Sequence, residues 1–244
     1  MPDRPALTAR QQARLDAFTQ AGYNFDPDLM ADYTAATGWR VDNYETELPP
    51  EAPGPPVAQG SWAAACEVLR RYSFPPPGLI TGIFLPDQPL AQRVMVLRAG
   101  FLGFSFWFGV RIGGVTDETR TLPGGGGQEQ VWGYNYRTLE GHFERGQIEF
   151  IVHKNLATGR VWCHIHAVSQ TGRIRNPFYW LGFKLFGRRL QVRFSRQSLE
   201  RLKAQVEQML QKGWLAPAAT GPVVEPISAH DEAQEQLEKN QPSS

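Results

Sequence analysis

The sequence predicts an α+β fold in which a curved antiparallel sheet of about seven strands wraps around a long C-terminal helix. The first observation is the stretch from about residue 79 to 170, where short alternating segments are separated by turn-forming residues. The second is the helical spacing of apolar residues that follows, from residue 177 to about 212. One strand, one helix, six strands and a long helix are accommodated by a sheet that curls around the last helix.

The composition is that of one ordinary globular domain. The 244 residues are 41% hydrophobic with a net charge of +1, which allows a full core and favours no charged partner. Cys66 and Cys163 lie far apart, which argues against a disulfide framework and suits a reducing compartment. No signal-like or membrane-spanning apolar run is found. We therefore expect a soluble, cytoplasmic protein, with peripheral membrane contact as an open alternative.

The first 38 residues are predicted to form a helical extension. Thr8 and Gln11 form a capping-box pattern at the start of a helix over 8–21, and a short helix follows that Gly38 ends. The tail after Trp214 has few apolar residues to bury. The expected organisation is an extension over 1–38, a sheet-and-helix domain over 39–212 and a disordered tail over 213–244.

The domain begins with one strand and one short helix. GWRVDNYETEL alternates as a strand does, and the proline-rich run 49–56 predicts a stiff linker. The next helix is predicted over 61–74, with Ser61 as its N-cap and an apolar face at three- and four-residue spacing. Three prolines at 75–77 end it.

Six further strands follow in the pattern. They are expected near 79–85, 92–99, 103–113, 129–138, 146–154 and 160–170. GGGG at 124–127 is expected to be a flexible hairpin tip, because the Lys-Ser/Thr of a phosphate loop is missing.

Two strands carry the residues expected to line a cavity. In 103–113 the inward face holds Phe104, Phe106, Phe108, Val110 and Ile112, whereas Arg111 lies on the other face. In 129–138 one face holds Trp132, Tyr134, Tyr136 and Thr138. This aromatic but polar-tipped face suits a cavity. The alternative is that the tyrosines place their hydroxyls at the rim of a filled core.

The hairpin over 146–170 has a well-specified register, because a slip of one residue would bury histidines. Ile148, Phe150 and Val152 should face inward with Val161, Cys163, Ile165 and Ala167. The outer face then holds Glu149, His153, His164 and His166. The HIH pair with Glu149 could ligate a metal, but exposed polar residues explain the same pattern. We predict no metal.

The turn between two of the strands, YRTLEGHFERGQIEF over 136–150, combines His142 with Glu144. An acid/base pair is conceivable, and a turn histidine bonded to backbone or carboxylate is the simpler interpretation. No nucleophile elbow, HExxH or zinc-spaced cysteine pair is present. The sequence therefore assigns no catalytic residue and no cofactor.

The C-terminal helix is basic and aromatic over 173–203, with nine Lys or Arg and one acid, Glu200. Such a face suits an anionic membrane surface, with Lys184, Arg188, Arg189 and Arg193 as candidate contacts. The favoured interpretation is a solvated charged face on a helix whose aromatic side fills the interior, and nucleic acid is the least favoured partner.

The stretch 136–150 resembles the signature of an uncharacterised family, the domain of unknown function numbered nineteen-ninety. The signature reads Tyr-Gly-Thr-Leu-Pro-Gly-His-Pro-Glu-x-Gly-Glu-Glu-x-Phe. The matching residues are Tyr136, Thr138, Leu139, Gly141, His142, Glu144, Gly146 and Phe150. The departing residues are Arg137, Glu140, Phe143, Gln147 and Ile148. The resemblance covers about residues 39–210 and implies a START-like, Bet v 1-like helix-grip fold with an apolar ligand between sheet and last helix.

The sequence favours non-catalytic binding of a hydrophobic small molecule such as a lipid, isoprenoid, pigment or polyketide-like compound. The candidate ligand-binding residues are Phe106, Phe108, Arg111, Tyr134, Tyr136, Thr138 and His142. A cyclase or hydrolase that uses His142, Glu144 and Tyr136 is one alternative. An interaction module without ligand, docking through the last helix or the N-terminal extension, is the other. The oligomeric state is left open.

Overall fold

A computed structural model describes residues 7–85, 88–101, 104–173 and 177–214. Seven antiparallel strands form one sheet in the order β1-β7-β6-β5-β4-β3-β2. The strands are β1 (Arg40–Leu48), β2 (Ile80–Ile83), β3 (Val94–Phe101), β4 (Phe104–Thr121), β5 (Gln128–Thr138), β6 (Glu144–Asn155) and β7 (Val161–Thr171). Every neighbour along the chain from β2 onward is also a neighbour in the sheet, whereas β1 pairs with the last strand, β7.

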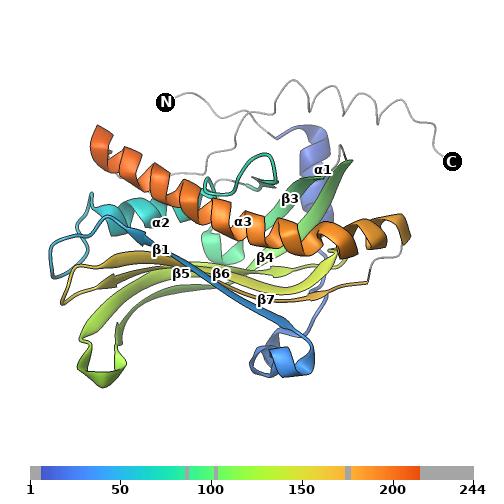
Figure 1. The fold of residues 1–244 in the computed structure, drawn as a ribbon. Helices are drawn as coiled ribbons and strands as arrows, with labels where there is room; N and C mark the ends of the chain where they lie inside the picture. Colours follow the sequence, from blue (N-terminus) through green and yellow to red (C-terminus); the bar gives the residue numbers. More distant parts are fainter. Residues whose placement is uncertain (1–6, 86–87, 102–103, 174–176, 215–244) are drawn as a thin grey trace.

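The long helix α3 (Pro177–Lys212) lies along one face of this curved sheet, and α2 (Ser61–Arg71) packs beside it on the same face (Figure 1). The spacing of apolar residues in α3 buries Phe194, Leu199, Leu202 and Val206 against the sheet and α2. The sheet's inner aromatic residues complete this core, so the expected helix-grip architecture is confirmed. Residues 215–244 of the expected disordered tail and the cap at Asn176 lie outside the described residues, whereas Trp214 of that tail packs against the core.

The N-terminal segment packs on the opposite face of the sheet. Helix α1 (Ala9–Thr19) begins with the expected Thr8–Gln11 capping box. It buries Leu15 against Val94 and Val96 of β3, and short 3₁₀ turns at Pro27–Asp32 and Ala35–Thr37 follow. The helical extension is therefore a third layer of the molecule, laid over the outer side of β3 and β4.

The start of α2 differs from the expectation. Its N-cap is Gly60, and the buried Ser61 hydroxyl has no partner among the described residues. The carboxylate of Glu51, from the proline-rich linker, instead accepts hydrogen bonds from the Trp62 amide at 2.8 Å and the Val57 amide at 3.0 Å. A side chain from the preceding linker thus does what the local capping pattern assigned to Ser61.

Strand β4 is longer than the predicted segment 103–113, because it continues to Thr121. The pairing with β5 shifts between Ile112 and Gly114, which marks a β-bulge. Gly113 is the extra residue of β4. The inward face is kept up to Ile112, and pairing with β5 resumes at Gly114. The structure thus places a bulge at this pair of glycines and continues the strand beyond it.

The β6–β7 hairpin has the predicted register, with Ile148 opposite Ala167, Phe150 opposite Ile165 and Val152 opposite Cys163. Cys66 and Cys163 are both free and buried in the core, as expected. None of the helices in the described part of the chain combines the length and the apolar character needed to cross a membrane.

Candidate functional site

A cavity of about 260 Å³ lies between the inner face of the sheet and the N-terminal half of α3. Its apolar wall comes from β3, β4, β5, β6 and α3, and includes Leu97, Phe106, Phe108, Tyr136, Ile148 and Phe194. Polar side chains enter it from β1, from the β5–β6 turn and from α3, and include Asp42, His142, Glu144, Gln191 and Ser195. An apolar cavity with a few convergent polar groups is the usual form of a small-molecule site.

Aromatic rings make up one side of the cavity. Phe106 and Phe108 follow each other on the inner face of β4 with parallel rings, their centroids 6.4 Å apart. Phe143 meets both rings edge-on, at 5.4 and 4.9 Å, and the His142 ring lies 4.5 Å from Phe108. Flat rings in these orientations offer both faces and edges to a bound molecule.

The β5–β6 turn brings His142 and Glu144 to the cavity. Gly141 has φ of +85°, a left-handed conformation that a glycine adopts without strain. Gly146 has φ of +142°, and a Cβ there would overlap the Val168 carbonyl oxygen of β7. The Thr138 hydroxyl accepts a hydrogen bond from the Gly146 amide at 2.9 Å and closes the turn. Both glycines are thus required by the backbone conformation of this turn.

The N-terminal extension holds this turn from outside. The Asn24 side chain donates to the Glu144 carbonyl at 2.7 Å and accepts from the Thr138 hydroxyl at 2.6 Å. The Glu140 amide donates to the Gly22 carbonyl at 2.9 Å. The extension therefore fixes the backbone of the segment that carries the polar cavity residues.

The His142 ring is neutral at physiological pH. Burial lowers its pKa to about 4. Its Nδ1 accepts a hydrogen bond from the Glu144 amide at 2.9 Å, so the single proton of the neutral ring is on Nε2. The ring is half-buried in the cavity wall and offers a hydrogen-bond donor.

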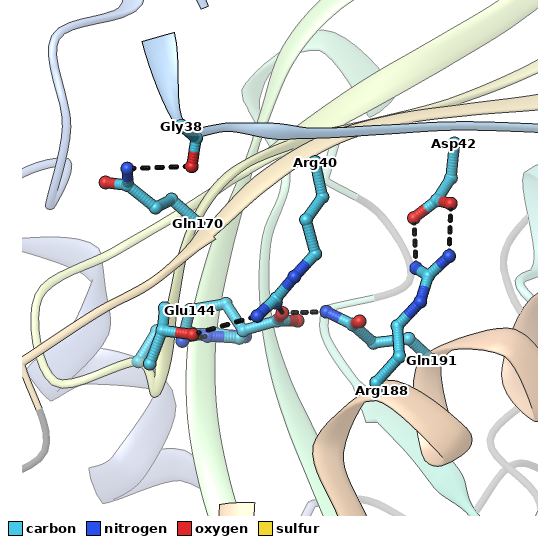
Figure 2. Close-up of polar contacts among 9 residues, drawn as sticks. Gly38, Arg40, Asp42, Glu144, Gln170, Arg188 and Gln191 are labelled. Carbon is cyan, nitrogen blue, oxygen red and sulfur yellow. Dashed lines mark hydrogen bonds and ion pairs between the residues drawn. The ribbon is translucent and has the colours of Figure 1, made fainter. Parts of the chain in front are cut away.

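The Glu144 side chain is held by groups from β1 and α3, which Figure 2 shows converging on it. Gln191 of α3 donates to its Oε1, and the Arg40 guanidinium of β1 lies 3.9 Å from the same oxygen. Burial raises the pKa of Glu144 to about 7, while the positive charges of Arg40 and Arg188 oppose that shift. A carboxyl group poised near neutrality can give or take a proton.

A second ion pair joins β1 to α3 beside Glu144. Both terminal nitrogens of the Arg188 guanidinium donate hydrogen bonds to the Asp42 carboxylate, at 2.5 and 2.7 Å (Figure 2). Arg145 donates to the Gln170 side-chain oxygen at 2.8 Å, and Gln170 donates to the Gly38 carbonyl at 3.0 Å. The Arg188–Asp42 pair ties the edge of the sheet to α3 at the polar end of the cavity, whereas the Arg145–Gln170 contact lies on the outer face, over Trp39.

Five of the seven residues expected to bind ligand line the cavity, namely Phe106, Phe108, Tyr136, Thr138 and His142. Tyr134 lies on the inner face but is 2% exposed, and its hydroxyl donates to the Leu69 carbonyl of α2 at 2.9 Å. Tyr134 thus belongs to the core. Arg111 is a correction, because it lies on the outer face and donates to the carbonyls of Thr19 and Ala21.

The basic residues of α3 differ from one another. Arg188 is engaged by Asp42, so it is not a free surface charge, whereas Arg189 and Arg193 are exposed. The side chain of Lys184 lies outside the described residues. On the outer face of the sheet, His164 and His166 both approach the Asn43 side-chain oxygen, at 3.2 and 2.8 Å. No group of His, Cys, Asp and Glu within the described ranges is arranged to hold a metal ion.

Sequence reasoning missed the residues that β1 and α3 contribute. Asp42 and Arg40 lie on the inner face of β1, on the same side as Tyr44 and Leu48. The apolar alternation at the start of β1 is that of Trp39 and Val41, but these residues face outward, with Val41 42% exposed. The buried Leu48 at the end of the strand indicates which alternate residues face inward. Gln191 is adjacent to Val192 of the predicted apolar stripe of α3, and the sequence pattern does not single it out.

Comparisons with solved structures find weak likenesses. The aromatase/cyclase Zhui from Streptomyces sp. R1128 superposes with a TM-score of 0.46 at 14% identity, over 72% of this chain and 99% of that one. A norcoclaurine synthase point mutant from Thalictrum flavum gives 0.45 at 11%, over 70% and 95%. Ara h 8.0201 gives 0.41 at 13%, over 70% and 99%. Likenesses this weak carry nothing about ligand or activity.

No curated protein matches the sequence. The model of one family, described as domain of unknown function (DUF1990), matches residues 28–201. That range includes the sheet, the turn with His142 and Glu144, and most of α3. The match begins inside the expected extension, earlier than the resemblance at about residue 39, so the 3₁₀ turns before β1 are part of it. The chain belongs to the DUF1990 family.

Proposed function

We propose that this protein binds a small hydrophobic molecule in the cavity between the sheet and α3, without transforming it. The single observation behind the proposal is a preformed cavity of about 260 Å³ whose wall is mostly apolar and whose polar groups gather at one end. Removing apolar ligand surface from water supplies about 25 cal/mol per Å². The polar end then selects the orientation of the ligand.

The core around the cavity supports binding over a purely structural role. Phe150, Tyr134 and Leu202 fill the neighbouring part of the molecule completely, each at 2% exposure or less. Small residues, among them Ala99, Gly100 and Ala167, line the opening that this dense packing leaves beside α3. An opening beside a tightly packed core suits a ligand.

Native and denaturing mass spectrometry of the purified protein test the proposal, with organic extraction of anything lost between the two. A discrete apolar molecule released on denaturation is the expected result. Ala167→Leu, which fills the cavity from β7, should abolish its retention, while the exposed helix substitution Ala204→Leu should not. Equal retention by wild type and Ala167→Leu would place the molecule elsewhere.

A second candidate is an acid/base enzyme in the same cavity. Such an enzyme requires that His142 and a carboxylate both reach the cavity. His142 and Glu144 both line the cavity. The pKa of Glu144, raised to about 7, suits proton transfer near neutral pH. Glu144→Gln separates the two functions. A binder should release the same molecule from both proteins, whereas an enzyme should accumulate a substrate of different mass in the variant.

We also propose that the protein is cytoplasmic and exchanges its ligand at an anionic membrane surface. Arg189 and Arg193 are exposed on α3 near the cavity and suit acidic headgroups. Flotation with vesicles containing phosphatidylserine should recover the wild type and lose the Arg189→Glu/Arg193→Glu variant. Equal recovery of both proteins would leave the exposed arginines without a membrane role.

A further inference from the structure

One hydrogen-bond acceptor in the cavity wall has no partner in the part of the chain that the structure describes. Gln191 reaches from α3 to the polar end of the cavity, where its Nε2 donates to Glu144. Its Oε1 is shielded from solvent and accepts no hydrogen bond from the described residues. Native proteins rarely leave a buried amide oxygen unpaired. Because Gln191 also lines the cavity, a molecule bound there can supply the missing donor.

The charged groups around Gln191 are already neutralised by one another. Asp42 is paired with both ends of the Arg188 guanidinium, and Glu144 is held by Arg40 and Gln191. The Arg145 guanidinium lies on the outer face of β6, over the Trp39 ring, and bonds Gln170 there. An ionic ligand would lose its hydration here without gaining a free counter-charge from these residues. The polar end consequently favours an uncharged group.

The other available polar group at this end is a donor. His142 uses Nδ1 to accept the Glu144 amide, which leaves the Nε2 proton for an oxygen in the cavity. A hydroxyl group is the smallest uncharged group that both donates and accepts. One hydroxyl, or a hydroxyl with a second oxygen on the same molecule, can therefore serve Gln191 and His142.

The remaining wall specifies the body of the ligand. The Phe106 and Phe108 rings are parallel, and Phe143 approaches both edge-on. These are the geometries in which a further aromatic ring packs favourably. A volume of about 260 Å³ is below the usual range of about 300–1,000 Å³ for ligand pockets, which favours one or two rings over a long acyl chain.

We propose that the cavity takes an uncharged aromatic molecule bearing a hydroxyl group, with the rings against Phe106, Phe108 and Phe143 and the hydroxyl donating to Gln191 Oε1. The assignment rests on the proposed binding function and names the chemical class of its ligand. Gln191 is then the residue that determines specificity, since it distinguishes a hydroxyl from an ether or a carboxylate at the same place on the ring.

Three matched probes test this class by isothermal titration calorimetry at pH 7. They are 2-naphthol, 2-methoxynaphthalene, which lacks the donor, and 2-naphthoate, which is charged. Wild-type protein should bind 2-naphthol about three- to tenfold more tightly than 2-methoxynaphthalene, as one net hydrogen bond predicts, and 2-naphthoate should be the weakest. Gln191→Met keeps the length of the side chain and removes the acceptor, so the two uncharged probes should then bind equally.

Gln208→Met is the matched control, because it makes the same substitution at an exposed position of the same helix. It should retain the preference for 2-naphthol. An unchanged preference in Gln191→Met, or no preference in the wild type, would overturn the role of Gln191 and leave the binding function standing. Tightest binding by 2-naphthoate would overturn the uncharged class.

Failure to bind any probe would overturn the aromatic class. The mass-spectrometric extraction then separates the two proposals. If it still releases an apolar molecule, only the ligand class is wrong. If it releases nothing, the binding function fails with it.

Discussion

Glu51 joins three parts of the chain that are distant in sequence. Its carboxylate caps the first turn of α2, holds the Val57 amide of the linker and pairs with the Lys154 ammonium of β6 at 2.6 Å. Lys154 is completely buried and also donates to the Pro55 carbonyl at 2.9 Å. A charged ammonium is stable at this buried position only while the carboxylate compensates its charge.

Removing Glu51 should therefore unfold the protein far more readily than removing an exposed partner. Glu51→Ala leaves the Lys154 charge uncompensated, and we expect the free energy of unfolding to fall by about 3–5 kcal/mol in urea titrations. Glu47→Ala, which removes the exposed partner of Arg160, is the control and should change it by less than about 1 kcal/mol. Similar losses for both variants would contradict the special role of Glu51.

Glu144 and His142 should give the stability opposite dependences on pH. Burial raises the pKa of Glu144 to about 7, so the folded state holds its proton longer than the unfolded chain does and stability falls as the pH rises toward 7. Burial lowers the pKa of His142 to about 4, so there the unfolded chain binds the extra proton and stability rises from about pH 4 to about 6.5.

Glu144→Gln isolates the first of these effects. Because glutamine does not titrate, the stability of wild type relative to the variant should decline between about pH 4.5 and 7, by at most about 3 kcal/mol, and stay level above that. Urea unfolding across the range measures it. A stability difference that rises with pH would mean that the neighbouring arginines outweigh burial.

At the scale of elements, the β5–β6 turn depends on a segment that is more than a hundred residues earlier. Asn24 bonds both the Thr138 side chain and the Glu144 backbone, and the Tyr23–Leu139 bridge lies beside it. The turn itself is exposed at Gly141, and on its inner side Phe143 packs against Phe106 and Phe108. The extension therefore determines how firmly His142 and Glu144 are placed.

Asn24→Ala should loosen this turn more than it destabilises the whole. We expect amide hydrogen exchange to accelerate selectively over 138–146, with a loss of about 1–2 kcal/mol in global stability from the two missing hydrogen bonds. Asn43→Ala on the outer face of β1 is the matched substitution and should leave exchange in the turn unchanged. Uniform acceleration along the chain would show that Asn24 has only a global effect.

At the scale of the whole molecule, the sheet is covered on both faces by different means. Helices α2 and α3 cover the inner face, and α3 lines the cavity, while α1 and the 3₁₀ turns cover part of the outer face. Two contacts of tryptophan rings hold the N-terminal segment on the outer face. Tyr33 stacks on Trp39 at 3.9 Å, and the Arg14 guanidinium lies 3.8 Å above the Trp107 ring.

Deleting residues 1–38 should expose an apolar surface on β2, β3 and the β5–β6 turn, made of Ile83, Val94, Val96 and Leu139. Such a surface promotes association, so the shortened protein should aggregate and bind a hydrophobic dye. Light scattering and dye fluorescence measure this. A monodisperse shortened chain with unchanged thermal stability would show that the extension is a separate, dispensable attachment.

The sequence predicted most of the fold because its local signals agreed. Alternation on β4 to β7 fixed the inward face, since an opposite register would have buried charged and imidazole groups. The capping box at Thr8 and the stripe of α3 were equally local. The bulge at Gly113 and the cap at Ser61 were misjudged because each depends on a partner from another element, β5 in one case and Glu51 in the other.

The site was predictable only in its aromatic half. Phe106, Phe108 and Tyr136 share an alternation that any strand of this pattern would show, so the sequence by itself determined which faces line the interior. Whether the interior is filled or hollow depends on how closely α3 approaches the sheet. Whether Glu144 is charged depends on its burial and on Arg40 and Arg188, which come from β1 and α3, far from it in the sequence. Tertiary structure alone decided these properties, because desolvation and hydrogen-bond pairing are set by neighbours in space.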